Sequence, residues 1–212
     1  MQKTISNIRN LIFDLDETLI LLPVDWSLVY RELGRLLGRE VSSFTTTLSA
    51  LWGSELYGEV SRLVEKYELE SLNGLIVLDD SPRILRKLWE NYELNLTSLQ
   101  SRRSIESVLN LIGVRELFKV VVSRDEQPTR SGQIKLVLSI EGYKASETMM
   151  VGDRVNDVLS ALENNCKAAL LVRRASELEN LRKLGLESET LILNSLMEFY
   201  SILNREKRIE FK

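Results

Sequence analysis

The stretch LIFDLDET, residues 11–18, joins a short apolar run to two aspartates, Asp14 and Asp16. An apolar run of this length that ends in acid is typical of a buried parallel strand with a polar carboxyl end. Asp14 and Asp16 lie two residues apart, so in an extended chain both side chains can point to the same side. Two carboxylates this close repel each other unless a cation lies between them or one of them is protonated. The stretch therefore predicts a charged site at the end of a buried strand.

Five more apolar runs of strand length follow, separated by segments with helical periodicity. The predicted strands cover residues 93–97, 119–122, 148–152, 168–172 and 190–193. The predicted helices cover residues 82–91, 102–112, 132–141, 155–164, 176–184 and 195–203. Alternation of this kind predicts an α/β fold with a doubly wound parallel sheet, whose crossovers are right-handed. The functional site of such a sheet lies beyond the carboxyl ends of its strands.

One interval, residues 24–72, breaks the alternation because it is helical only. The predicted helices in it cover residues 26–37, 40–52 and 54–69. We therefore expect residues 1–20 and 75–212 to form the α/β core domain, and residues 21–74 to form an inserted, all-helical cap domain. The aromatic side chains of the interval are expected to form the core of this small unit rather than a ligand cage; they are Trp26, Tyr30, Phe44, Trp52 and Tyr57.

The composition limits the chemistry and the partners of the chain. The 28 basic and 31 acidic residues give a net charge of -3 with the signs interleaved, so we expect no nucleic-acid partner. The chain has no histidine, which excludes histidine-based triads and histidine-ligated zinc, so carboxylates must carry any catalysis. Its single cysteine, its lack of a membrane-length apolar run and its lack of a signal-peptide pattern predict a soluble, cytoplasmic protein with no membrane partner.

A second pair of acids follows the predicted strand at residues 148–152. Asp153 lies in the turn after this strand, and Asp157 lies about one helical turn later. If the two acid-ended strands are central and adjacent, the four carboxylates of Asp14, Asp16, Asp153 and Asp157 meet at one place. Carboxylate oxygens, with water and phosphate oxygens as further ligands, form the kind of site that Mg²⁺ prefers. The sequence therefore predicts a bound Mg²⁺ cofactor.

Together these motifs resemble those of the haloacid dehalogenase superfamily. The DxDxT stretch at residues 14–18 is similar to the first motif of the family, Thr97 at the end of a predicted strand to the second, and GDRVND at residues 152–157 to the fourth. The resemblance extends over about residues 10–203, and the helical interval lies where many members carry a mobile cap. By overall layout the chain is similar to phosphoglycolate phosphatases, an analogy of fold alone.

The resemblance implies a magnesium-dependent phosphatase that hydrolyses a small phosphate monoester. Asp14 would attack phosphorus to give an aspartyl-phosphate, and Asp16 would protonate the leaving alkoxide and then activate water. Thr97 would hydrogen-bond a phosphoryl oxygen. Mg²⁺ would be held by Asp14, Asp153 and the Asp16 carbonyl, and Asp157 would support a ligand or bind through water.

The third motif of the family is ambiguous in this chain. The family has a lysine near the start of the helix that precedes the fourth-motif strand, whereas residues 127–135 read QPTRSGQIK. Arg130 matches by position and Lys135 matches by residue type, and the two cations are not interchangeable. Both are kept as candidate catalytic residues. Position 17, commonly glycine in the family, is Glu17 here.

Two further functions share these motifs. A phosphomutase or nucleotidase of the same superfamily would differ in what occupies the cap. A catalytically degenerate module that binds phosphate or regulates another protein would account for the ambiguous third motif. The expected partner of the site is a small phosphorylated metabolite, and the oligomeric state has no signal in the sequence.

Overall fold

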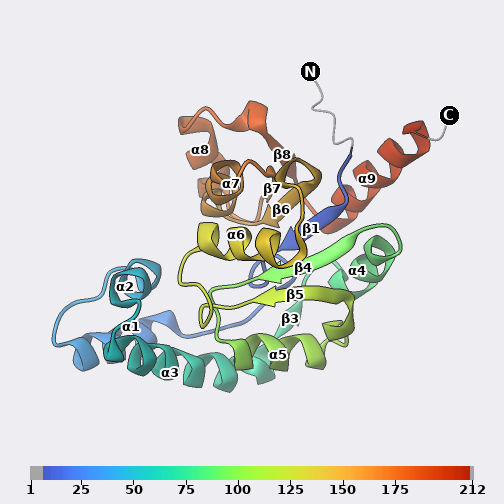
Figure 1. Cartoon of the computed structure of the whole chain (residues 1–212). Helices are drawn as coiled ribbons and strands as arrows, with labels where there is room; N and C mark the ends of the chain where they lie inside the picture. The colour runs from blue at the N-terminus through green and yellow to red at the C-terminus, as the bar shows by residue number, and fades with distance from the viewer. Residues whose placement is uncertain (1–6, 211–212) are drawn as a thin grey trace.

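A six-stranded, all-parallel sheet forms the centre of the computed structural model, which describes residues 7–210, and only the backbone of residues 206–210. Its strands lie in the order β5-β4-β1-β6-β7-β8. Their bounds are β1 Asn10–Phe13, β4 Glu93–Thr97, β5 Phe118–Val122, β6 Thr148–Gly152, β7 Lys167–Leu171 and β8 Thr190–Leu193. This architecture confirms the predicted α/β class with a doubly wound parallel sheet (Figure 1).

Helices cover both faces of the sheet. Their bounds are α4 Ser81–Trp89, α5 Arg102–Leu111, α6 Arg130–Glu141, α7 Val155–Glu163, α8 Ala175–Lys183 and α9 Leu196–Glu210. Leu11 and Phe13 of β1 pack in the cluster that α4, α5 and α9 share, whereas Ile12 packs in the cluster of α6 and α7. Successive strand residues point to opposite faces, so β1 is buried on both sides and reads as a continuous apolar run.

Four short 3₁₀ segments complete the described chain: η1 Ser71–Gly74, η2 Arg115–Leu117, η3 Ala145–Glu147 and η4 Glu187–Glu189. Among the described helices, none is long and apolar enough to cross a bilayer.

Three helices between β1 and α4 form a unit with its own apolar core (Figure 1). They are α1 Trp26–Leu37, α2 Phe44–Leu51 and α3 Glu55–Glu70. Each begins after a side chain that accepts a backbone N–H, namely Asp25, Ser43 and Ser54. Helix α2 begins at Phe44 and not at residue 40 as predicted, because the backbone of Ser43 is extended and its hydroxyl accepts a backbone N–H at the start of the helix.

The aromatic residues of this unit divide into two groups. The Trp26 ring lies 5.5 Å from the Phe44 ring and 5.9 Å from the Tyr30 ring, centroid to centroid. Trp52, in contrast, is 44% exposed at the end of α2 and contacts Tyr57 edge-on. The prediction that Trp52 belongs to the core is therefore wrong, because α2 ends before this residue and turns its side chain outward.

The two connections between the helical unit and the six-stranded sheet lie side by side in a small antiparallel sheet of two strands. Its strands are β2 (Ile20–Leu21) and β3 (Ile76–Val77). The connections approach each other closely near Gly74, where a Cβ atom would lie only 2.8 Å from Pro23 Cγ. No sequence signal predicted this two-stranded sheet, since strands of two residues show no periodicity.

A buried ion pair joins α3 to the core. Arg124, which follows β5, is fully buried, and its Nη1 donates to Glu68 Oε1 at 2.5 Å and to Leu99 O at 3.0 Å. The other two guanidinium nitrogens also donate: Nε to Ser61 Oγ and Nη2 to Ser61 O, both at 2.9 Å. The Tyr57 hydroxyl donates to Arg124 O at 2.5 Å. The helical unit is thus fixed to the core along α3.

We expect Arg124→Met to lower the free energy of unfolding by about 3–5 kcal/mol, because it leaves the Glu68 carboxylate buried without its cation. Urea denaturation measures the change. The matched control is Arg182→Met, which breaks an exposed ion pair with Glu187 and should cost at most about 1 kcal/mol. Equal, small losses in the two variants would show that Arg124 does not anchor α3.

Candidate active site

The strand register brings the predicted site residues to one edge of the sheet. Phe13 pairs with Leu96 of β4 on one side and with Val151 of β6 on the other. The residues that come next along these three strands are Asp14, Thr97 and Gly152, the last followed by Asp153. The ends of three adjacent parallel strands therefore deliver acids and a hydroxyl to one place, at the carboxyl edge where such sheets bind ligands.

Three of the four predicted metal ligands form a buried cluster. Asp14, Asp153 and Asp157 each offer one carboxylate oxygen, and these three atoms lie within 4.8 Å of one another. The residues are 6%, 1% and 4% exposed. The Asp16 side chain lies outside this cluster, because its Oδ1 accepts the backbone N–H of Leu22 at 2.9 Å. A role of Asp16 at the metal would fall to its backbone carbonyl alone.

Electrostatics favour a cation at this cluster. Burial raises the pKa of Asp14 and of Asp153, and neighbouring carboxylates raise both further, while Arg130 offsets part of the effect on Asp14. Asp153 Oδ1 is buried and has no hydrogen-bond partner among the described residues. Carboxylates in this arrangement resist ionisation together unless positive charge is added. The donor set, all oxygen and anionic, fits Mg²⁺.

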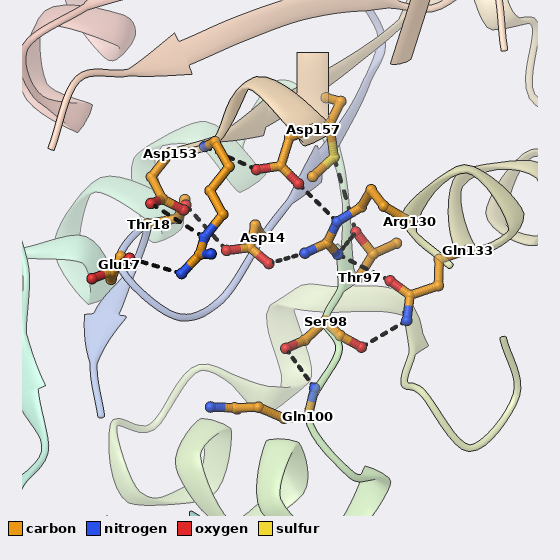
Figure 2. A network of polar contacts seen from close by, with 12 residues as sticks. Asp14, Glu17, Thr18, Thr97, Ser98, Gln100, Arg130, Gln133, Asp153 and Asp157 are labelled. Carbon is orange, nitrogen blue, oxygen red and sulfur yellow. Dashed lines mark hydrogen bonds and ion pairs between the residues drawn. The ribbon is translucent and has the colours of Figure 1, made fainter. Parts of the chain in front are cut away.

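Arg130 links the acids to the second-motif threonine. Its Nη2 forms an ion pair with Asp14 Oδ1, its Nη1 donates to Thr97 Oγ1 at 2.8 Å, and its Nε lies 2.8 Å from Asp157 Oδ1. Gln133 Oε1 accepts from Nη1 at 3.0 Å (Figure 2). Thr129 caps α6, so Arg130 is its first residue and projects from the end of the helix that faces the site.

Lys135, the alternative by residue type, lies elsewhere. It is exposed, whereas Arg130 is 6% exposed among the acids. Five residues along an α-helix correspond to a rotation of about 140°, which turns Lys135 away from the face that Arg130 occupies. The structure therefore places Arg130 among the clustered acids and Lys135 on the exposed side of α6.

Close packing explains the glycine of the fourth motif. A Cβ atom at Gly152 would lie 2.2 Å from Asp157 Oδ2. That carboxylate folds back over the turn and accepts the backbone N–H of Arg154 at 3.2 Å. A side chain at position 152 would push Asp157 out of the acid cluster, so the GDxxxD spacing depends on glycine.

Three residues at the site were given no role from the sequence: Glu17, Thr18 and Arg174. Thr18 Oγ1 donates to Asp14 Oδ2 at 3.4 Å, and Arg174 Nη2 lies 3.1 Å from Asp153 Oδ2. Glu17, at a positive φ of 60° that favours glycine, pairs with both Arg154 and Arg174. Arg174 follows β7 within three residues, so its place after a predicted strand was the available signal.

A cavity of about 390 Å³ opens onto the acids. The helical unit supplies one wall, made of Val24, Trp26, Tyr30, Ser42, Ser43, Phe44, Thr45 and Glu68. The core supplies the other, made of Asp14, Asp16, Ser98, Leu99, Gln100, Arg130, Arg154, Asn156 and Asp157. Three candidate catalytic groups, those of Asp14, Asp16 and Arg130, therefore lie at the core wall of a pocket that the helices cover.

Comparison with known proteins agrees with this geometry. The family model of the haloacid dehalogenase-like hydrolases matches residues 31–171. The chain belongs to this family of hydrolases. No curated protein sequence matches the chain.

Solved structures show the same fold. A haloacid dehalogenase-like family hydrolase from Streptococcus pneumoniae superposes with a TM-score of 0.70 at 17% identity, covering 93% of this chain and 99% of that one. A predicted phosphatase from Clostridium acetobutylicum gives 0.68 at 19% identity, covering 94% and 100%. A HAD-hydrolase from Bacillus subtilis, bound to magnesium, gives 0.63 at 16% identity, covering 93% and 99%.

Proposed function

We propose that this chain is a magnesium-dependent phosphatase that hydrolyses a small phosphate monoester through an aspartyl-phosphate on Asp14. The observation that carries the proposal is the position of the Asp14 carboxylate, which lies at the pocket wall, contacts the Arg130 guanidinium and clusters with the carboxylates of Asp153 and Asp157. A nucleophile, a fixed cation and a cation-binding cluster are the parts that phosphoryl transfer requires.

In this proposal, the Arg130 guanidinium and the Thr97 hydroxyl donate hydrogen bonds to the phosphoryl oxygens. A guanidinium presents paired N–H donors that match phosphate geometry. Because Arg130 already contacts Asp14, Asp157 and Thr97, its position is fixed before substrate arrives. Fixed donors of this kind stabilise the charge that develops as Asp14 attacks phosphorus.

Asp16 supplies the proton chemistry. It lines the pocket, and burial raises its pKa to about 6, with the Leu22 N–H acting in the opposite direction. The protonated carboxyl gives its proton to the departing alkoxide as the P–O bond breaks. The resulting carboxylate then takes a proton from the water that attacks the aspartyl-phosphate, which restores both aspartates and releases phosphate.

Asp14, Asp153 and Asp157 would hold the Mg²⁺, with the Asp16 carbonyl as a further ligand. When bound, the ion would offset the negative charge of the carboxylates and of the incoming phosphoryl group. Magnesium in the similarly folded hydrolase from Bacillus subtilis supports this part of the proposal. A cytoplasmic location, where the buried free thiol of Cys166 stays reduced, belongs to the same proposal.

We expect Asp153→Asn to weaken Mg²⁺ binding at least tenfold, since even residues that only orient metal ligands contribute about 10- to 100-fold to affinity. Isothermal titration of metal-stripped protein with MgCl₂ measures the change. Asp80→Asn, at an exposed carboxylate that pairs with Arg83, is the control and should bind as the parent does. Equal affinity in both variants would show that Asp153 is not a ligand.

For Asp16→Asn, we expect a loss that depends on the leaving group. With an alkyl phosphate, kcat/KM should fall about 10²- to 10⁴-fold, because the alkoxide needs a proton as it departs. With p-nitrophenyl phosphate the loss in kcat/KM should be smaller, because that leaving group departs unprotonated. Identical losses with both substrates would argue against Asp16 as the acid.

The proposed function is tested by hydrolysis of p-nitrophenyl phosphate by metal-stripped protein with and without added Mg²⁺. We expect turnover only with the metal. Absent turnover in folded protein would refute the phosphatase and favour the binding or regulatory module, whereas metal-independent turnover would refute the magnesium dependence. Mass spectrometry of products separates the remaining alternatives: a phosphomutase returns a phosphorylated isomer, and a nucleotidase prefers nucleoside monophosphates in a substrate screen.

A further inference from the structure

We propose that the substrate is the phosphate monoester of an uncharged, hydroxylated alcohol of sugar or polyol type, and that Gln100 hydrogen-bonds one of its hydroxyls. This inference rests on the proposed function and narrows the substrate class of the same pocket. It departs from the analogy with phosphoglycolate phosphatases, whose substrate carries a second anionic group.

Charge in the pocket argues against a second anion on the leaving group. The helical wall contributes one charged side chain, Glu68, and its carboxylate already accepts from Arg124 and from the Ser101 N–H. On the core wall, Arg130 pairs with two aspartates and Arg154 pairs with Glu17. Both arginines that line the pocket therefore already have an acidic partner. A substrate carboxylate would lose its hydration there without gaining a free cation as a partner.

Gln100 carries a polar group that the protein itself does not satisfy. The residue is 7% exposed, and its Oε1 is buried without a hydrogen-bond partner among the described residues. The backbone holds it in place, because its N–H donates to Ser98 Oγ at 3.2 Å and its carbonyl accepts from Arg124 N at 3.2 Å. A buried polar atom left unpaired is costly, so its presence in a pocket wall points to a ligand that pairs with it.

A hydroxyl is a ligand group that can pair with this amide oxygen. It can donate to the amide oxygen or accept from the amide nitrogen, whereas a carboxylate can only accept. A hydroxyl therefore satisfies Oε1, the atom that lacks a partner, and a carboxylate does not.

The rest of the helical wall has the character that a sugar or polyol requires. The rings of Trp26, Tyr30 and Phe44 form an apolar surface, and the Ser42 and Thr45 residues beside it are exposed and carry hydroxyl groups. A sugar presents C–H groups on its faces and hydroxyls at its edge, which suits such a mixed wall. The volume of about 390 Å³ is at the small end of ligand pockets and suits one such group.

A substrate panel tests the charge argument with the parent protein and saturating Mg²⁺. The panel contains hexose, pentose and polyol phosphates on one side, and phosphoglycolate and phosphoglycerate on the other. We expect the best substrate with an uncharged leaving group to exceed the best carboxylated substrate at least tenfold in kcat/KM. Preference for a carboxylated substrate overturns the inference alone. Lack of hydrolysis of every compound, p-nitrophenyl phosphate included, overturns the proposed function itself.

Gln100→Leu tests the hydroxyl contact. We expect kcat/KM for the preferred substrate to fall about 10- to 100-fold, and the loss to shrink for the deoxy analogue that lacks the bonded hydroxyl. Asn204→Leu replaces an exposed amide on α9 and is the matched control. If Gln100→Leu does not fold, Gln100→Met keeps the length of the side chain and serves instead. A loss that is the same for every deoxy analogue, or no loss, overturns the assignment of Gln100.

Discussion

Asp14→Asn should lower turnover of a phosphate monoester about 10⁴-fold or more, because an amide cannot attack phosphorus. The substitution also removes one of the three carboxylates that would hold Mg²⁺. Shape and most contacts stay the same, so the loss is chemical rather than structural. Single-turnover rates with p-nitrophenyl phosphate measure it.

The same variant should not lose stability. Burial raises the pKa of Asp14, and the nearby carboxylates of Asp157 and Asp16 raise it further, against the opposing effect of Arg130. Because the net shift is upward, the ionised form is disfavoured in the fold, and its contribution to the free energy of unfolding becomes less favourable as pH rises. A neutral amide removes that penalty. Urea denaturation of the metal-stripped variant at neutral pH should therefore give a free energy of unfolding no lower than that of the metal-stripped parent. Activity of the variant above about 1% of the parent would contradict the assignment of Asp14 as the nucleophile.

Arg130→Ala should lower kcat/KM about 10³-fold or more, while Lys135→Ala should stay within about twofold of the parent. Arg130 is the cation that contacts Asp14, Asp157 and Thr97, whereas Lys135 is exposed on α6. Steady-state kinetics with p-nitrophenyl phosphate compare the two. Circular dichroism checks that Arg130→Ala is folded, because the substitution leaves buried acids without their cation.

Arg130→Lys refines this comparison. A lysine keeps the positive charge but has a single compact ammonium group in place of the planar guanidinium. It therefore cannot contact all three partners of Arg130 at once. We expect activity between those of the parent and of Arg130→Ala. Equal and mild effects of the alanine variants at positions 130 and 135 would mean that neither residue supplies the cation of the site.

The sheet could be predicted because its strands are buried on both faces. β1 and β6 read as unbroken apolar runs that end in glycine or acid, and this pattern needs no tertiary information. The pairing of β2 with β3 could not be predicted, since strands of two residues show no periodicity and the pairing is set by the return of the chain after α3. The predicted start of α2 at residue 40 was wrong because the backbone of Ser43 is extended, and apolar periodicity does not show which residue adopts that conformation.

Individual parts of the site differ in how far the sequence could specify them. The acids follow apolar runs, so their meeting at one edge follows from the strand order. The choice between Arg130 and Lys135 needed the helix phase, which the Thr129 cap sets. Gln100 and Arg174 lie in loops, and the direction of a loop side chain depends on tertiary contacts that no local pattern encodes.

The most direct test of the covalent mechanism is to trap the intermediate and locate it. Protein is quenched in acid during turnover of saturating substrate with Mg²⁺, reduced with borohydride, which converts an aspartyl-phosphate to homoserine, and digested for mass spectrometry. We predict homoserine at position 14, in greater yield in Asp16→Asn, whose second step lacks its general base. Substrate turnover with no modification, or with the modification at another acid, would contradict the account.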